Sequence, residues 1–190
     1  MDRYRCPTCR KVVQCQGKGK LGFLVHDHYV KEIGGKFARN GCLTIQEGKI
    51  PAIPENWYEP WFDEIPVAYR SRNRQNYVRK WREPDLIVLS DDRLVKVIEV
   101  QGTAEDYGIL AAKVAKINTY LRPRETIVFH AVKYVDRFLK PERRRRLEEI
   151  MGVQPRSYRE VDQYYQKKFE RERALKFTLW SEEDLMTARR

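Results

Sequence analysis

The residues best suited to chemistry lie on two consecutive apolar segments near the middle of the chain. Asp85 opens segment 84–89, while Glu99 and Gln101 close segment 97–101. Side chains alternate along a strand, so Glu99 and Gln101 project from the same face. Burying Glu99 among apolar neighbours is costly unless it is paired or binds a cation. Two acidic groups at one strand edge are the oxygen donors that Mg²⁺ (or Mn²⁺) prefers, so the pattern predicts a metal site at Asp85 and Glu99.

Whether the two carboxylates share one face depends on the register between their strands. Placing Asp85 opposite Glu99 in an antiparallel pair leaves residues 91–93 as a three-residue loop. A two-residue loop would put the carboxylates on opposite faces, because one step of register moves every side chain to the other face. We therefore predict the three-residue loop, with Asp92 or Arg93 in the left-handed conformation.

A second group of candidate residues lies near the N-terminus. Cys6-Pro7-Thr8-Cys9 has the form of a metal knuckle, whose two thiolates reach one tetrahedral Zn²⁺ from a tight turn. Strands at 11–15 and 21–25, joined by a glycine-containing turn, would form a hairpin that returns toward Cys9. A redox pair is the alternative, but no strand of thioredoxin type precedes the motif, so we favour structural zinc. The candidates for the other two ligands are Cys15, His26 and His28.

Basic residues gather immediately before Asp85. Between Ala68 and Pro84, six basic residues accompany the single acid Glu83 and three interleaved aromatic residues. This composition is typical of a surface that follows nucleic-acid phosphates, and a solvated charged surface is the alternative. The basic residues of this nucleic-acid-binding candidate are Arg70, Arg72, Arg74, Arg79, Lys80 and Arg82. A second basic run lies at 143–146. For this run, an ordinary solvated helix surface is as good an interpretation as a nucleic-acid-binding surface.

The elements that must hold these residues alternate between helix and strand. Capping and periodicity signals predict a helix over 27–39, two strands at 85–89 and 94–101, a helix over 103–121 and a buried strand at 126–132. This order indicates a mixed α/β core.

Changes in composition divide the chain into three parts. They are a zinc-binding hairpin at 1–26, a core at 27–135 and a helical extension at 136–190. The extension carries apolar and aromatic residues at near-helical spacing, which could pack back on the core or form a dimer. These residues are Tyr158, Val161, Tyr165, Phe169 and Leu175 or Phe177.

Pro84-Asp85, Glu99-Val100-Gln101 and the surrounding element order together resemble the PD-(D/E)xK nuclease superfamily. The resemblance covers about residues 27–135. It implies a restriction-endonuclease-like mixed β-sheet flanked by helices, with Mg²⁺ bound by Asp85 and Glu99. It also implies that Gln101 helps to place the attacking water.

This chain departs from the family pattern at the third position, which is usually lysine and is here Gln101. A cation for the scissile phosphate must then come from elsewhere. Lys96 lies three residues before Glu99 on the same strand and therefore points to the opposite face. Lys113 lies early in the following helix, close to the strand end that carries Gln101, and is our candidate for a migrated lysine.

The charge of the chain agrees with a polyanionic partner. It has 38 Lys and Arg against 27 Asp and Glu, a formal net charge of +11. No apolar run approaches the roughly 18 residues of a membrane helix and no signal peptide is visible, so we expect a soluble, intracellular (cytoplasmic) protein with no membrane partner.

The resulting expectation is a Mg²⁺-dependent DNA endonuclease with structural Zn²⁺. Water would attack the phosphodiester in line while the metal and a cation stabilise the developing charge. Its substrate would be duplex or branched DNA, in restriction, junction resolution, repair or viral processing, and a homodimer would suit cleavage of two strands. The alternatives are a non-catalytic nucleic-acid-binding protein on the same fold and a scaffold whose basic surface serves solubility.

Overall fold

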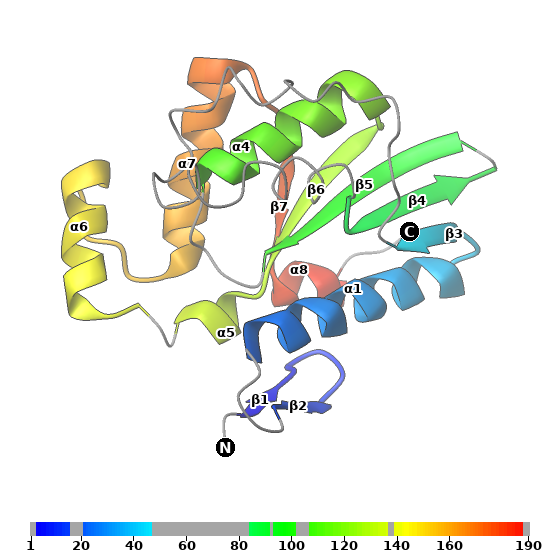
Figure 1. The fold of residues 1–190 in the computed structure, drawn as a ribbon, viewed down its shortest axis with the longest axis horizontal. Coiled ribbons are helices and arrows are strands. Elements are labelled where there is room, and N and C mark those ends of the chain that lie inside the picture. Colours follow the sequence, from blue (N-terminus) through cyan, green and yellow to red (C-terminus); the bar gives the residue numbers. More distant parts are fainter. Residues whose placement is uncertain are drawn as a thin grey trace, which may run out of the picture.

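A five-stranded mixed sheet forms the centre of the protein in the computed structural model (Figure 1). The structure describes residues 3–15, 21–46, 84–91, 93–101, 107–136 and 139–187. The strand order is β3-β4-β5-β6-β7, with the first two pairs antiparallel and the last two parallel. The strands are β3 (Leu43–Gln46), β4 (Leu86–Ser90), β5 (Arg93–Gln101), β6 (Glu125–His130) and β7 (Thr178–Trp180).

Helices cover both faces of the sheet (Figure 1). One face packs against α1 (Leu21–Arg39), and the other against α4 (Tyr107–Lys116) and α7 (Tyr158–Arg173). The expectation of a mixed α/β fold with flanking helices is thus confirmed. The remaining elements are β1 (Arg3–Arg5), β2 (Val12–Gln14), the π-helical turn η2 (Ile117–Leu121), α5 (Val132–Val135), α6 (Pro141–Met151) and α8 (Glu182–Thr187).

Two-sided cover explains the apolar sequence of the central strands. Ile98 and Val100 of β5 belong to the cluster under α1, whereas Val128 of β6 belongs to the cluster under α4 and α7. A strand buried on both faces needs apolar side chains at successive positions rather than at alternate ones. Glu99 projects from the α4 side of this strand and is completely buried, so its charge requires a partner inside the protein.

The connection between β4 and β5 differs from the predicted one. Ser90 is opposite Arg93, so the turn contains two residues, and the prediction of a three-residue loop is wrong. The left-handed residue of the turn is Asp91, with φ of 50°, while Asp92 lies outside the described residues. Two-residue hairpin turns commonly require positive φ, which Asp tolerates better than most residues because its short side chain bonds locally.

A register shift between Val88 and Leu89 compensates for the shorter turn. Beyond this irregularity Leu86 is opposite Ile98, and the same register extended by one residue puts Asp85 opposite Glu99. A β-bulge adds one residue to one strand and thereby changes which residues share a face. The two carboxylates therefore lie on the same side of the ladder, as the register argument required, although the loop is not the one expected.

The N-terminal hairpin also differs from the expected one. Residues 21–25 belong to α1 and not to a strand, and the observed hairpin pairs β1 with β2 around the cysteine knuckle. α1 begins six residues before the expected start because its apolar residues already recur at every fourth position there. The buried members of this series are Leu21, Val25, Tyr29, Ile33 and Phe37.

The C-terminal segment packs back on the core. Phe169 contacts the cluster formed by α4 and β6, while Tyr158 and Val161 contact residues of α5. The segment also supplies β7, an edge strand parallel to β6, which the sequence analysis assigned to a helical region. No helix in the described part of the chain has the length and apolar character needed to cross a membrane.

Candidate active site and metal centre

Asp85 lies directly before β4 and is held by the neighbouring strand. The backbone N–H of Val100 donates a hydrogen bond of 2.7 Å to its Oδ2. Its Oδ1 lies 3.2 Å from Nε2 of His26, on α1. The side chain is thereby fixed at the end of β4, on the side of the ladder from which Glu99 also projects.

Glu99 has its cation partner on the helix that follows β5. Nζ of Lys113 lies 2.5 Å from Oε2 of Glu99. The second carboxylate oxygen, Oε1, is buried and has no hydrogen-bond partner. Lys113 is the residue that the sequence analysis named as a migrated lysine, and the structure brings it into direct contact with the predicted acidic centre.

Burial and mutual charge determine how these groups titrate. Burial opposes ionisation of Asp85, but the positive charge of Lys113 and the hydrogen bond from His26 outweigh it and hold the pKa of Asp85 at about 2. Burial, together with the nearby charge of Asp85, raises the pKa of Glu99. Burial also opposes the charge of Lys113, yet the attraction of Glu99 and Asp85 dominates and raises the lysine pKa.

His26 is the member of this site whose role the sequence analysis missed. Its pKa is raised because the hydrogen bond and charge of Asp85 outweigh the effect of burial. We had grouped His26 with the zinc candidates, on the assumption that this segment is a strand. In a helix, residues two apart point about 200° away from each other, so His26 and His28 cannot face the same cluster. The signal that could have corrected this was the apolar period extending back to Leu21.

Gln101 ends β5 and is half-buried. It lies beside His130 in the parallel pairing of β5 with β6. Lys96 forms an ion pair with Glu125 at the other end of β5, so it does not contribute to the acidic centre. The centre therefore consists of Asp85, Glu99, Lys113 and His26, with Gln101 two residues further along the strand.

This arrangement has two chemical features. The unpartnered Oε1 of Glu99 and the carboxylate of Asp85 are hard oxygen donors of the kind that divalent cations bind. Lys113 is a charged donor in contact with Glu99, and its positive charge also acts on Asp85. The ligating atoms of Asp85, Glu99 and His26 are not all within 4.8 Å of one another, however. Among the described residues, a different group of side chains meets this condition.

That cluster consists of Cys6, Cys9 and His28, whose ligand atoms all lie within 4.8 Å of one another and could hold a metal ion. Cys9 Sγ is 3.5 Å from His28 Nε2. The knuckle turns between β1 and β2, and the chain closes it with a hydrogen bond of 2.9 Å from the N–H of Cys6 to the carbonyl of Lys11. α1 presents His28 to the knuckle from the side.

The three groups of the cluster differ in how they ionise. Burial raises the pKa of the Cys9 thiol, which opposes the thiolate form, whereas Cys6 and His28 are shifted toward the forms that bind metals. Burial raises the pKa of Cys6, but hydrogen bonds from the N–H of Cys9 and the hydroxyl of Thr8 outweigh it and lower the pKa. Burial lowers the pKa of His28, which favours the neutral imidazole that ligates metals. Cys15 is buried in the core beside the hairpin and is not a member of the cluster, and neither is His26.

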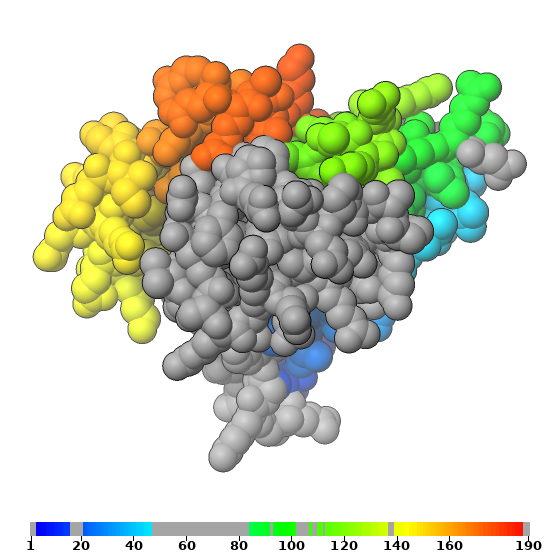
Figure 2. Space-filling model, turned by 45° about the horizontal axis from the view of Figure 1, so that its top comes forward, coloured from blue at the N-terminus to red at the C-terminus, as the bar shows by residue number. Residues whose placement is uncertain are grey.

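The candidate phosphate-tracking stretch, Arg70 to Arg82, lies outside the described residues. The second basic run falls on α6, where it includes Arg143, Arg144, Arg145 and Arg146. α6 has no buried residue and lies at the margin of the molecule (Figure 2). Arg145 and Arg146 are exposed on this helix, whereas Arg143 and Arg144 are half-buried and Arg143 lies over the ring of Tyr158.

Comparison with known proteins adds no relative: no family model, no curated protein and no solved structure matches the chain. The argument about function therefore depends on the geometry described above.

Proposed function

We propose that this protein is a metal-dependent endonuclease that hydrolyses phosphodiester bonds in DNA, on a core of the PD-(D/E)xK type. The observation that carries the proposal is the contact of 2.5 Å between Lys113 and Glu99. A lysine on the helix after β5 supplies the cation that the strand lacks at Gln101. The order of α1, β4, β5, α4 and β6 follows the helix, two strands, helix and strand on which the resemblance was based, and β3 is an additional strand.

The residues of this chain would have distinct roles in the reaction. Asp85 and Glu99 would bind Mg²⁺ or Mn²⁺, which supplies Lewis acidity and lowers the pKa of water. Lys113, released from Glu99 when a divalent cation binds there, would donate to the nonbridging oxygens of the phosphate as negative charge develops on them. Gln101 would orient the attacking water through its amide. His26 would fix the carboxylate of Asp85 through its 3.2 Å contact.

The cysteine knuckle would hold a structural Zn²⁺ through Cys6, Cys9 and His28, with a fourth ligand that completes the tetrahedron. Support for this assignment comes from the soft thiolate and imidazole donors and from their mutual distances. The site would attach the short β1–β2 hairpin to α1, since a two-stranded hairpin has little stability of its own.

A non-catalytic nucleic-acid-binding protein is the second candidate, and one observation favours it. Both carboxylates already have cationic partners within the protein, His26 for Asp85 and Lys113 for Glu99. In such charge-balanced pairs the carboxylates can have a purely stabilising role in the core. Gln101 also departs from the family pattern. Under this alternative the basic surface binds DNA without cleavage.

Cleavage assays separate the two candidates. The full chain is incubated with plasmid, branched and single-stranded DNA in Mg²⁺, Mn²⁺ or EDTA. Under the first proposal we expect metal-dependent cleavage that Asp85→Asn and Glu99→Gln abolish, while Lys96→Gln, on the same strand but outside the centre, retains it. Salt-sensitive binding without cleavage would establish the second candidate instead. If the protein neither cleaves nor binds DNA, both candidates are contradicted.

A further inference from the structure

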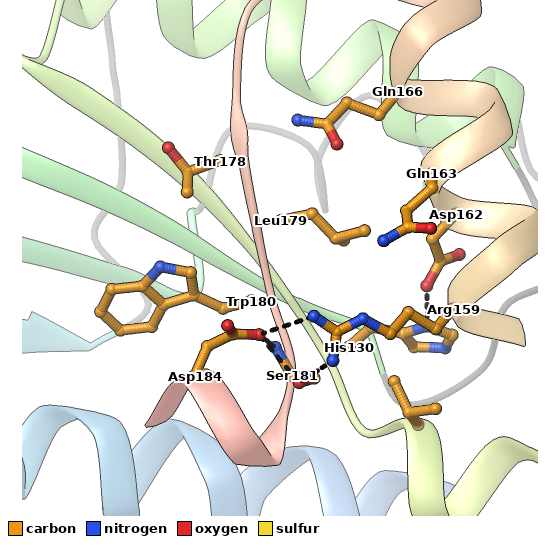
Figure 3. Close-up of a pocket in the computed structure, with 11 residues that line it drawn as sticks. His130, Arg159, Asp162, Gln163, Gln166, Thr178, Leu179, Trp180, Ser181 and Asp184 are labelled. Atoms are coloured by element: carbon orange, nitrogen blue, oxygen red, sulfur yellow. Dashed lines mark hydrogen bonds and ion pairs between the residues drawn. The ribbon is translucent and has the colours of Figure 1, made fainter. Parts of the chain in front are cut away.

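A cavity of about 220 Å³ lies between β7 and α7, on the opposite side of β6 from the acidic centre. Figure 3 shows Gln163 and Gln166 of α7 along one wall, Leu179 of β7 opposite them, and Arg159 reaching across the lower part. A cavity of roughly 150 Å³ holds a benzene molecule. The cavity found here is therefore large enough for a planar ring that carries substituents.

A buried histidine forms the floor of this cavity. His130, at the end of β6, is 1% exposed. Its Nδ1 is bonded to Oδ2 of Asp162, and Oδ1 of Asp162 accepts from the hydroxyl of Tyr107. Nε2 of His130 has no hydrogen-bond partner. In the tautomer whose Nδ1 proton is directed at Asp162, Nε2 is an acceptor. Buried polar atoms without a partner are rare and cost free energy, so this one indicates a ligand.

A second acceptor faces the same space. Nε2 of Gln166 donates to the carbonyl of Phe177 at 2.7 Å, which leaves the amide oxygen available. Figure 3 shows this oxygen directed downward, into the space bounded by Leu179 and Gln163. The cavity therefore offers one acceptor at its wall, Gln166 Oε1, and a second, His130 Nε2, buried at its floor, to a ligand that carries N–H donors.

The charge of the cavity excludes an anion as the ligand. Arg159 is its cation, but Nη2 is 3.8 Å from Asp184 and Nη1 is 3.4 Å from Glu183, so its charge is already matched. Nη1 also donates to the hydroxyl of Ser181 at 3.1 Å. Asp162 adds a further negative charge to the wall. A phosphate or carboxylate would be repelled, whereas a neutral ring with several N–H groups fits.

We propose that this cavity binds a nucleobase that carries an exocyclic amino group. In guanine, the exocyclic amino group and the ring N1–H would donate to His130 Nε2 and Gln166 Oε1, with Leu179 against the ring. A narrower cavity, lined also by Gln101, shares His130, Asp162 and Leu179 with this one. Gln101, which ends β5 two residues after Glu99, therefore lies close to the proposed base site. The role of this cavity in recognising substrate DNA rests on the proposed function. Its binding of a free nucleoside does not.

The test is titration of the full, zinc-loaded chain with nucleosides in buffer without added Mg²⁺ or Mn²⁺, monitored by calorimetry. Guanosine and inosine form the matched pair, because inosine lacks only the exocyclic amino group. We expect guanosine to bind about tenfold more tightly, the effect of one buried hydrogen bond. Gln166→Leu should weaken guanosine binding by a similar factor, and Gln154→Leu, a glutamine outside the cavity, should not. Because a nucleoside has no phosphodiester bond to cleave, this result does not depend on whether the acidic centre is catalytic.

Competition identifies the source of the base. Displacement of guanosine by a single-stranded oligonucleotide, but not by its abasic counterpart, assigns the cavity to nucleic acid, and absence of displacement assigns it to free nucleosides. Equal affinity for guanosine and inosine, no binding at millimolar nucleoside, or unchanged affinity in a folded Gln166→Leu variant would each overturn the proposal.

Discussion

His26 and His28 lie two positions apart on α1, and their side chains reach two different clusters. His26 Nε2 is 3.2 Å from Asp85 at the end of β4, and His28 Nε2 is 3.5 Å from Cys9 in the N-terminal knuckle. In an α-helix, the side chains of residues two positions apart point in directions that differ by about 200°. One turn of α1 thus connects the acidic centre with the candidate zinc site, and each site can be disturbed separately.

Replacing these two histidines should have opposite consequences for zinc. We expect the wild-type protein to contain one Zn²⁺, and His28→Ala or Cys9→Ser to lose it, because each removes a ligand. His26→Ala and Cys15→Ser should retain the metal, since neither residue belongs to the cluster. The measurement is zinc content by atomic emission after gel filtration. Zinc retained in Cys9→Ser, or lost in Cys15→Ser, would show that the ligand set is different.

The pair formed by His26 and Asp85 should make stability depend on pH. The pKa of His26 is raised above its ordinary value of 6.5, so its contribution is complete below pH 6.5 and disappears as pH rises through the higher, folded-state value. Asp85, with a pKa of about 2, remains ionised throughout this range. His26→Gln should therefore reduce the free energy of unfolding at pH 5 more than at pH 8.5.

Urea denaturation of wild type and His26→Gln at several pH values measures this difference. His28→Gln, prepared without zinc, is the control on the same helix. A pH-independent difference between wild type and His26→Gln would mean that the histidine stabilises the protein by packing and not by its charge.

Local patterns in the sequence predicted the elements of the core but not their connections. The apolar residues on either side of Glu99 and the apolar run after Pro123 predicted β5 and β6, because both strands are buried on two faces. The bulge at Val88 could not be predicted, since it depends on how two strands and a turn fit together. The strand Thr178–Trp180 was missed because an edge strand of three residues has no recognisable period.

The site could be predicted where a buried charge demanded a partner. Glu99 lies in an apolar strand, so a cation had to lie near it, and Lys113 was at the right distance along the chain. His26 was assigned to the other cluster because the start of α1 was placed too late. Asp162 and its bond to His130 could not be found, since 32 residues separate them and only the tertiary fold brings them together.

DNA binding should depend on the basic stretch before Asp85. Each lysine or arginine that contacts a phosphate contributes about −0.9 to the slope of log K against log salt. Arg79→Gln with Lys80→Gln should therefore reduce the magnitude of this slope by about two and weaken binding to any sequence. Arg171→Gln, an exposed arginine on α7 whose partner is Glu172, is the control. Fluorescence anisotropy from about 50 to 200 mM salt provides the measurement, and an unchanged slope would contradict the assignment.

Lys113 and Glu99 should be strongly coupled in stability. Lys113→Met leaves a buried carboxylate without its partner, which costs about 3–5 kcal/mol of the free energy of unfolding. The double variant Glu99→Leu, Lys113→Met removes both charges and should recover most of this loss, because a buried ion pair replaced by apolar residues is often neutral. Lys96→Met, which breaks a half-exposed pair with Glu125, should cost no more than about 1 kcal/mol.

Activity separates stabilisation from catalysis at this pair. If Lys113 acts on the phosphate, a folded Lys113→Met variant should have no cleavage activity. The double variant should be inactive in either case, because it also lacks the proposed metal ligand Glu99. Lys113→Arg, which keeps the charge, should retain part of the activity, whereas loss of one charge-stabilising donor reduces kcat about 10²–10³-fold. Full activity in a folded Lys113→Met variant would show that the lysine has a structural role only. The cation for the scissile phosphate would then have to come from the basic stretch before Asp85.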